Sequence, residues 1–271
     1  MKKNKNKLKI DKHKIKQIFT TKYRNINAYK ITIKNKMENK KNIQEIKTIV
    51  FEDFSLFTDK DFQKISNILT KEIKYFLNKI DKNYDKKSFR YFIAGLGSHD
   101  LAIDKLGYLV SSKVISTSIK LKENLLDKNY FGDVFSLSPS IANTNGQYTS
   151  DILSSLIEKF KPDVLFVIDS LICKKIDMIA RSFQISDVGL SPGELSRSKQ
   201  PSIKTQKVKI PVISIGCPLA YKICTPKYTH ILSIKDIDLA VVKLSRIIAF
   251  SLNRTLHPKL KGSEIEFLMD D

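Results

Sequence analysis

The sequence is short of the residues that build disulfide frameworks and metal sites. It has three cysteines (Cys173, Cys217 and Cys224), an odd number without CxxC spacing, and four histidines without an HExxH motif. Disulfide frameworks and zinc sites need such residues in even sets or at close spacing. We therefore predict a protein with no disulfide, no metal and no other cofactor, suited to a reducing, cytoplasmic setting.

Long apolar runs and linker residues are also scarce. The longest apolar run covers residues 164–168, far below the roughly 20 residues of a membrane-spanning helix. No apolar stretch follows the charged N-terminus, so we predict neither a secretory signal nor membrane insertion. The 9 glycines and 8 prolines are too few for a fibrous chain, and 271 residues that are 42% hydrophobic can bury a substantial core.

Acidic residues are outnumbered by basic ones, 28 against 48, which gives a net charge of +20. Residues 1–48 alone carry 16 basic and three acidic side chains. We predict that residues 1–48 form a flexible basic arm, with one short amphipathic helix near residues 10–19 as an option, and that residues 49–271 form a single α/β domain. The arm could contact DNA or another anionic partner, or it could reflect a general preference of the chain for Lys, Asn and Ile.

Helical periodicity is clearest between residues 62 and 80, where apolar side chains recur at steps of three and four. Thr58 can cap this helix, and Asp61 lies where a capping box usually has Glu or Gln. Further helices are predicted at residues 104–112, 149–160, 171–181 and 236–252. Strands are predicted at residues 49–57, 91–94, 113–117, 164–168, 183–186 and 210–215. This alternation favours a three-layer α/β/α sandwich with a mostly parallel sheet.

Three aspartates follow predicted strands, where open α/β sheets bind their ligands. Asp169 comes directly after the apolar run 164–168, Asp187 follows the strand near Ile185, and Asp104 precedes a short helix after the strand 91–94. Two buried carboxyl groups that share a proton can act as a general acid–base pair on water. Alternatively, Asp104 and Asp169 cap helices and Asp187 orders a turn.

Two other motifs are candidates for a chemical site. The Gly95-Leu96-Gly97 turn lets a ligand approach the backbone, but Asp100 occupies the third glycine position of a dinucleotide-binding motif. Cys217 ends a predicted strand, and a buried structural role is favoured because a thiol nucleophile needs a histidine partner.

Five segments, taken together and in order, resemble motifs of the spore germination protease family. They include Phe92-Ile93-Ala94-Gly95-Leu96-Gly97-Ser98 with Asp104-Lys105-Leu106-Gly107, Val167-Ile168-Asp169-Ser170-Leu171 after Lys161-Pro162-Asp163, Gln184-Ile185-Ser186-Asp187-Val188-Gly189 with Pro192-Gly193, Ile210-Pro211-Val212-Ile213-Ser214-Ile215-Gly216-Cys217-Pro218, and Leu252-Asn253-Arg254-Thr255-Leu256-His257.

The resemblance implies a cytoplasmic endopeptidase of the forespore or spore interior. Members of the family degrade the small acid-soluble proteins that coat spore DNA, during germination. The resemblance further implies a fold similar to hydrogenase-maturation proteases, a homotetramer, and a zymogen whose propeptide would lie in residues 1–48. The family's two catalytic aspartates correspond to Asp104 and Asp169. Supporting active-site loops would be provided by Gly95, Gly97, Gly107, Asp187 and Gly193.

The sequence also departs from the family pattern. Ala102-Ile103 replaces Thr-Pro before the first aspartate, and a long family segment between Ile215 and the C-terminal helix is almost wholly missing. The alternative is a divergent, shortened, non-catalytic paralogue that binds DNA or spore proteins. Peptidyl-tRNA hydrolase shares the strand and Gly-Leu-Gly opening, but its later motifs do not occur here.

Overall fold

The structure is a computed structural model. It describes residues 15–23, 28–36, 43–51, 58–84, 88–139, 146–173, 175–193, 200–225 and 228–270.

A nine-stranded sheet runs through the molecule in the order β1-β2-β3-β7-β8-β6-β4-β5, and β9 pairs with the far end of β8. The strands are β1 (Ile15–Lys22), β2 (Ala28–Lys36), β3 (Gln44–Phe51), β4 (Arg90–Gly95), β5 (Asp133–Leu137), β6 (Val164–Cys173), β7 (Ser182–Ser186), β8 (Val212–Cys224) and β9 (Thr229–Leu232).

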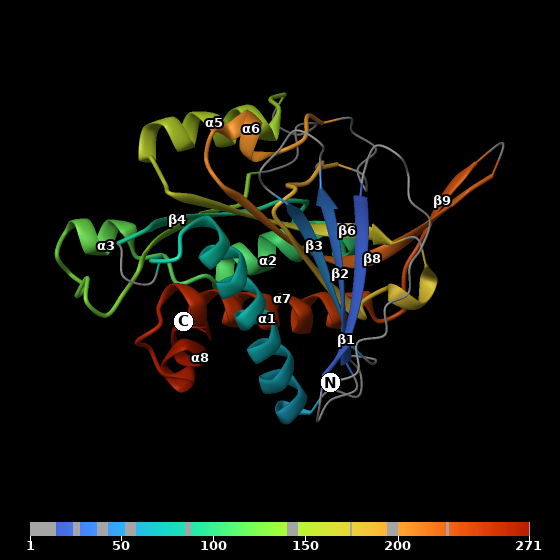
Figure 1. Ribbon diagram of the computed structural model, residues 1–271, viewed down its shortest axis with the longest axis horizontal. Helices are drawn as coiled ribbons and strands as arrows, with labels where there is room; N and C mark the ends of the chain where they lie inside the picture. Colours follow the sequence, from blue (N-terminus) through green and yellow to red (C-terminus); the bar gives the residue numbers. More distant parts are fainter. Residues whose placement is uncertain are drawn as a thin grey trace.

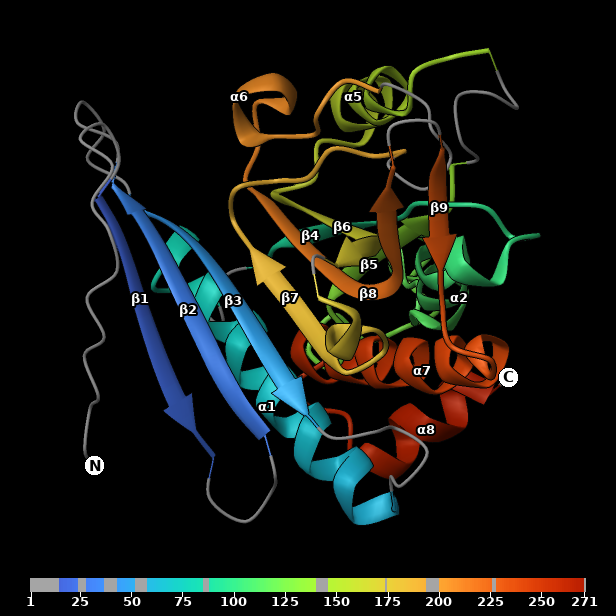
Figure 2. The ribbon, with the colours of Figure 1, turned by 90° about the vertical axis from the view of Figure 1, so that its right-hand side faces the viewer.

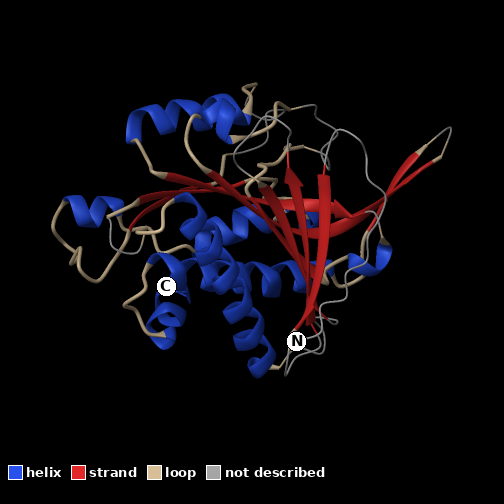
Figure 3. Ribbon diagram, viewed as in Figure 1, coloured by secondary structure: helices blue, strands red, loops and turns tan. Residues whose placement is uncertain are grey.

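Helices cover both faces of the central strands (Figures 1 and 3). One face carries α5 and α6, and the other carries α1, α2, α7 and α8, while α3 lies beside β5. The helices are α1 (Asp59–Ile80), α2 (Leu106–Lys113), α3 (Ser118–Lys122), α5 (Thr149–Phe160), α6 (Thr205–Val208), α7 (Ile237–Leu256) and α8 (Gly262–Asp270), with 3-10 turns η2 (Ala102–Asp104) and η3 (Ile176–Met178).

The sheet is mixed, which corrects the prediction of a mostly parallel one. The neighbours β5, β4, β6 and β8 are parallel, but β7 runs antiparallel to β8 and to β3, and β1, β2 and β9 are also paired antiparallel. The connection from β4 to β5 contains α2 and α3, and the connection from β5 to β6 contains α5, as expected for helical crossovers. The expected similarity to hydrogenase-maturation proteases remains a prediction.

Two strands and most of a third lie within the segment that the sequence analysis assigned to a flexible arm, and residues 49–51 of the third belong to the strand predicted at residues 49–57. β1, β2 and β3 form an antiparallel ribbon that joins the main sheet through β7, and α1 packs against it (Figure 2). The prediction of an unstructured arm or a short helix is therefore wrong for these strands, and residues 1–14 lie outside the described residues.

Ion pairs explain why so polar a segment can pack. Lys47 of β3 and Glu72 of α1 are only 4% and 6% exposed, and the Lys47 Nζ lies 2.7 Å from a Glu72 carboxylate oxygen. Lys30 contacts the other Glu72 oxygen at 2.5 Å. Burial by itself would raise the pKa of Glu72, but these two ammonium groups hold it below its usual value. Two of the charges that suggested a solvated arm, on Lys30 and Lys47, instead neutralise Glu72 on α1.

The central strand is β6. Val164–Ile168 are all fully buried, with alternate side chains facing the two helical layers. This confirms the predicted strand, whose continuous apolar run is typical of a parallel strand covered on both faces. The predicted helix at residues 62–80 is also confirmed as part of α1, with a complete capping box between Thr58 and Asp61.

Two side chains hold the connection between α2 and β5, namely Asn253 of α7 and His257 directly after that helix. Asn253 accepts a hydrogen bond from the Ile115 N–H (2.9 Å) and donates to the Lys113 carbonyl (2.9 Å). His257 Nδ1 accepts from the Gly132 N–H (3.2 Å), and its Nε2 lies 3.0 Å from the Ile115 carbonyl oxygen, which it contacts as a donor in this tautomer. These bonds satisfy backbone groups of residues 113–117, where the predicted strand does not form.

The buried imidazole of His257 should make the protein sensitive to acid. Burial lowers the pKa of His257 to about 4 in the folded protein. As the pH falls, the imidazole is therefore protonated in the unfolded state before it is protonated in the folded state. Stability is therefore fully retained above pH 6.5 and falls as the pH drops towards 4, by up to about 3 kcal/mol from this residue. His257→Gln should lack that part of the pH dependence in urea unfolding between pH 7 and pH 4.

His230→Gln provides the matched control because His230 is exposed. It should keep the pH dependence of the unmodified chain. Equal pH dependence in all three proteins would contradict the assignment to His257.

Candidate active site

Two glycines let α2 lie directly against the end of β4. A Cβ atom on Gly95 would be 2.0 Å from the Gly107 carbonyl oxygen, and one on Gly107 would be 2.2 Å from the Leu96 carbonyl oxygen and 2.6 Å from that of Ile168. The Leu96 N–H also donates to the Ile168 carbonyl at 2.8 Å. Backbone contact at this point brings the loop after β4 beside the carboxyl end of β6.

Asp104 ends the short turn η2 within this loop and is 4% exposed. The Ser98 N–H lies 3.1 Å from both the Asp104 carboxylate Oδ2 and its carbonyl oxygen. Gly97, at φ 104°, has no room for a Cβ, which would be 2.0 Å from that carbonyl. Burial raises the pKa of Asp104 to about 6, against the opposing effect of the Ser98 hydrogen bond.

The helix-cap interpretation fails for Asp104. The residue at the N-cap of α2 is Lys105, and no side chain caps the helix there. The carboxylate instead closes the loop back to Ser98.

Asp169 lies inside β6, beside Gly216 of β8 in the parallel register, and is 6% exposed. Its Oδ1 accepts a hydrogen bond from the Ser170 N–H at 2.9 Å. The predicted helix at residues 171–181 does not form, because residues 171–173 continue β6 along β8 and only the turn η3 follows. Asp169 therefore caps no helix.

Asp104 and Asp169 line one small cavity of about 10 Å³, past the carboxyl end of β4 and beside the middle of β6. Its wall also contains Leu96, Gly97, Pro139, Thr149, Pro192, Gly193 and Gln200. Two buried carboxyl groups facing a shared space are equipped to hold and exchange a proton with a water molecule bound between them.

The predicted supporting residues divide into two groups. Gly97 and Gly193 line the cavity, and Gly95 and Gly107 provide the close packing behind it. Asp187 lies elsewhere: its carboxylate accepts from the Glu45 N–H at 2.7 Å and pairs with Lys79 at 2.5 Å. It borders a different cavity between α1, β3 and α6. Asp187 therefore fastens the N-terminal strands to the main sheet, and its placement in the site is corrected.

Sequence analysis missed Thr149, at the start of α5, and Gln200. The Gln200 side-chain oxygen accepts a hydrogen bond from the Thr149 N–H at 3.4 Å, and both residues line the cavity. Neither belongs to a chemically recognisable pattern, so contact in the folded chain is the only signal for them. Pro192 precedes Gly193 in a segment that the resemblance had already included.

The remaining candidates have no place in the cavity. Cys217 is fully buried, as expected, and burial raises the pKa of its thiol. Within the described ranges, no cluster of three His, Cys, Asp or Glu side chains could hold a metal ion. In the same ranges, no helix combines the length and apolar character needed to span a membrane.

Comparison with known proteins identifies the family of the chain. A sequence model of the family described as "Germination protease" matches residues 1–226, which contain both aspartates and all the cavity residues. The chain belongs to the germination protease family. It is thus related to peptidases, and the family resemblance is confirmed, with four of the five segments inside the matched residues.

Individual germination proteases match over a shorter region. The proteins from Geobacillus sp. (strain WCH70) and Bacillus mycoides (strain KBAB4) are each 34% identical over 158 residues, and that from Bacillus anthracis (strain CDC 684 / NRRL 3495) is 33% identical over 158 residues. These matches cover 58% of this chain but only 41–42% of each relative's length.

Proposed function

We propose that this germination protease family member is an endopeptidase that hydrolyses small acid-soluble spore proteins during germination. The observation that carries the proposal is the meeting of Asp104 and Asp169, from two separate segments, at one buried cavity. Both are the positions that match the catalytic aspartates in the family resemblance.

In the proposed mechanism, a water molecule is held between the two carboxyl groups. The ionised one takes a proton from water as the oxygen attacks the scissile peptide carbonyl, while the protonated one donates to the carbonyl oxygen. A proton then passes to the leaving amine as the C–N bond breaks. A pKa of about 6 for Asp104 suits proton exchange near neutral pH.

The finer family properties are part of the same proposal. The enzyme would act in the forespore or spore interior as a homotetramer made from a zymogen, with no cofactor and no membrane partner. The N-terminal basic segment would provide any propeptide and could contact DNA. Because β1, β2 and β3 are integrated in the sheet, removal of a propeptide that includes them would expose the β7 edge and α1.

The test is cleavage of a purified small acid-soluble spore protein by the full chain and by Asp169→Asn. We expect the substitution to lower kcat by about 1,000-fold, because a general acid–base group is worth about 10²–10⁴ in rate. Asp177→Asn is the matched control, since Asp177 is exposed and outside the cavity, and it should cleave normally. Full activity of Asp169→Asn would refute the mechanism, and no cleavage by the unmodified chain would favour the non-catalytic paralogue.

A further inference from the structure

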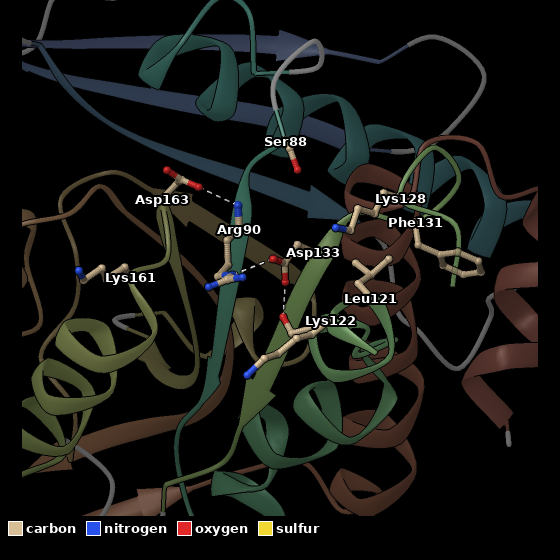
Figure 4. A pocket seen from close by; sticks show the side chains of 10 residues that line it. Ser88, Arg90, Leu121, Lys122, Lys128, Phe131, Asp133, Lys161 and Asp163 are labelled. Carbon is tan, nitrogen blue, oxygen red and sulfur yellow. Dashed lines mark hydrogen bonds and ion pairs between the residues drawn. The ribbon is translucent and has the colours of Figure 1, made fainter. Parts of the chain in front are cut away.

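A second, larger hollow lies at the opposite end of the parallel strands. It is an open groove of about 500 Å³ where β4, β5 and β6 begin (Figure 4). The aspartate cavity lies past the end of β4 and beside Asp169 of β6. Four of its wall residues are basic, namely Arg90, Lys122, Lys128 and Lys161, and two are acidic, namely Asp133 and Asp163. We call it the basic groove.

The two carboxylates of the basic groove are already engaged by the protein. Asp133 accepts from Arg90 Nε at 2.7 Å and from the Ser118 hydroxyl. Asp163 accepts from the Arg90 backbone N–H at 2.7 Å. Arg90 also donates to the Phe160 carbonyl at 3.0 Å. These contacts fix Arg90 as part of the groove floor and occupy the acidic groups.

The three lysines, by contrast, have no ion-pair partner within the described part of the chain. All three are exposed, and Figure 4 shows Lys161 and Lys128 on either side of the Arg90–Asp133 pair, with Lys122 beside it. Each comes from a different segment: the end of α3, the turn before β5, and the residue after α5. The fold therefore gathers three unpaired ammonium groups around one groove.

We propose that the basic groove binds the phosphodiester backbone of DNA without sequence preference. An ammonium group is a compact point charge that can pair with phosphate oxygens from many directions, which suits contact with a nucleic-acid backbone irrespective of base sequence. The one guanidinium here is held by Asp133 and the Phe160 carbonyl, so the three lysines provide the free positive charge of the groove. The net charge of +20 adds a long-range attraction for a polyanion.

This binding does not depend on peptide cleavage, because the groove and the aspartate cavity lie at opposite ends of the strands. It also locates DNA contact on the folded domain and not solely on the N-terminal segment.

The experiment measures binding of the full-length chain to a fluorescent 20-base-pair duplex by anisotropy between 50 and 200 mM salt. The test variant carries Lys122→Gln, Lys128→Gln and Lys161→Asn. Asparagine is chosen at residue 161 because the φ there is 50°, a conformation that Asn tolerates well. The control variant carries Lys60→Gln, Lys71→Gln and Lys235→Gln, which remove the same charge from exposed positions outside the groove.

We expect the groove variant to bind about 10- to 100-fold more weakly at 100 mM salt, equally for duplexes of different sequence, with a salt slope shallower by about 2–3. The control variant should lose far less affinity for the duplex. Equal losses in the two variants, or no binding by the unmodified chain, would overturn the proposal. If the groove variant lost binding to labelled poly-glutamate but bound DNA as well as the unmodified chain, the groove would be assigned to an acidic protein. That result would also overturn the proposal. Unchanged thermal unfolding of the groove variant verifies its fold.

Discussion

Asp104→Asn should abolish cleavage of the spore-protein substrate while making the protein more stable at pH 7. The loss in kcat should be about 1,000-fold, since one member of the proposed acid–base pair is removed. The gain in stability follows from burial, which raises the pKa of Asp104 to about 6. Folding at neutral pH therefore forces an ionised carboxylate into a poorly solvated site, and the amide removes that cost of about 3 kcal/mol.

The sign of the pH dependence provides the check. Between pH 3.8 and 6 the folded state binds more protons at Asp104 than the unfolded state, so this group destabilises the fold progressively as the pH rises through that window. Urea unfolding should show Asp104→Asn more stable than the unmodified chain at pH 7 and nearly equal to it at pH 4. Asp177→Asn should match the unmodified chain in activity and stability. An active or destabilised Asp104→Asn protein at pH 7 would contradict the account.

Gly107→Ala should destabilise the fold by about 3–5 kcal/mol, although alanine is the better helix former by about 1 kcal/mol. Gly107 lies in the first turn of α2, and a Cβ there would be 2.2 Å and 2.4 Å from the Leu96 carbonyl oxygen and nitrogen. These are backbone atoms at the end of β4, so they yield only if the strand moves. The same movement would displace Asp104 from Asp169, and cleavage should fall with stability.

Gly262→Ala is the matched control for this substitution. Gly262 begins α8, and the nearest atom to a Cβ there is the Phe250 ring at 3.6 Å, an ordinary contact. Chemical denaturation should show this variant as stable as the unmodified chain or more stable by up to about 1 kcal/mol. If Gly107→Ala unfolded at the same denaturant concentration as Gly262→Ala, the close packing of α2 on β4 would be wrong.

Local sequence patterns were sufficient to predict those helices and strands whose structure depends mainly on their own residues. The capped periodic segment gave α1, and the continuous apolar run gave the buried part of β6. The rule that ligands bind at the carboxyl ends of parallel strands selected Asp104 and Asp169, and the structure places both at one cavity.

The predictions that were wrong concern positions whose conformation depends on a contact with a residue far away in the sequence. Residues 171–173 have a helix-like pattern, but β8 is long enough to continue the pairing past Asp169, so they become strand. Residues 113–117 look like a strand, yet Asn253 and His257 satisfy backbone groups of Ile115 from the side. Asp187 directly follows β7, as the rule on strand ends requires. Because β7 runs antiparallel to β8, the end of β7 lies near the start of β8, away from the aspartate cavity. The strand-end rule applies only to parallel neighbours.

By itself, the sequence determined the family and the α/β class and selected the two aspartates as candidates, because these depend on residue types at short spacing within segments and on the order of those segments. Only the tertiary structure decided that the basic N-terminal segment enters the sheet, since the charges of Lys30 and Lys47 are compensated by Glu72, which lies on another element. The same holds for the basic groove, whose lysines are scattered in sequence. Charge compensation and charge clustering are properties of distances in space, and the linear order of residues does not contain those distances.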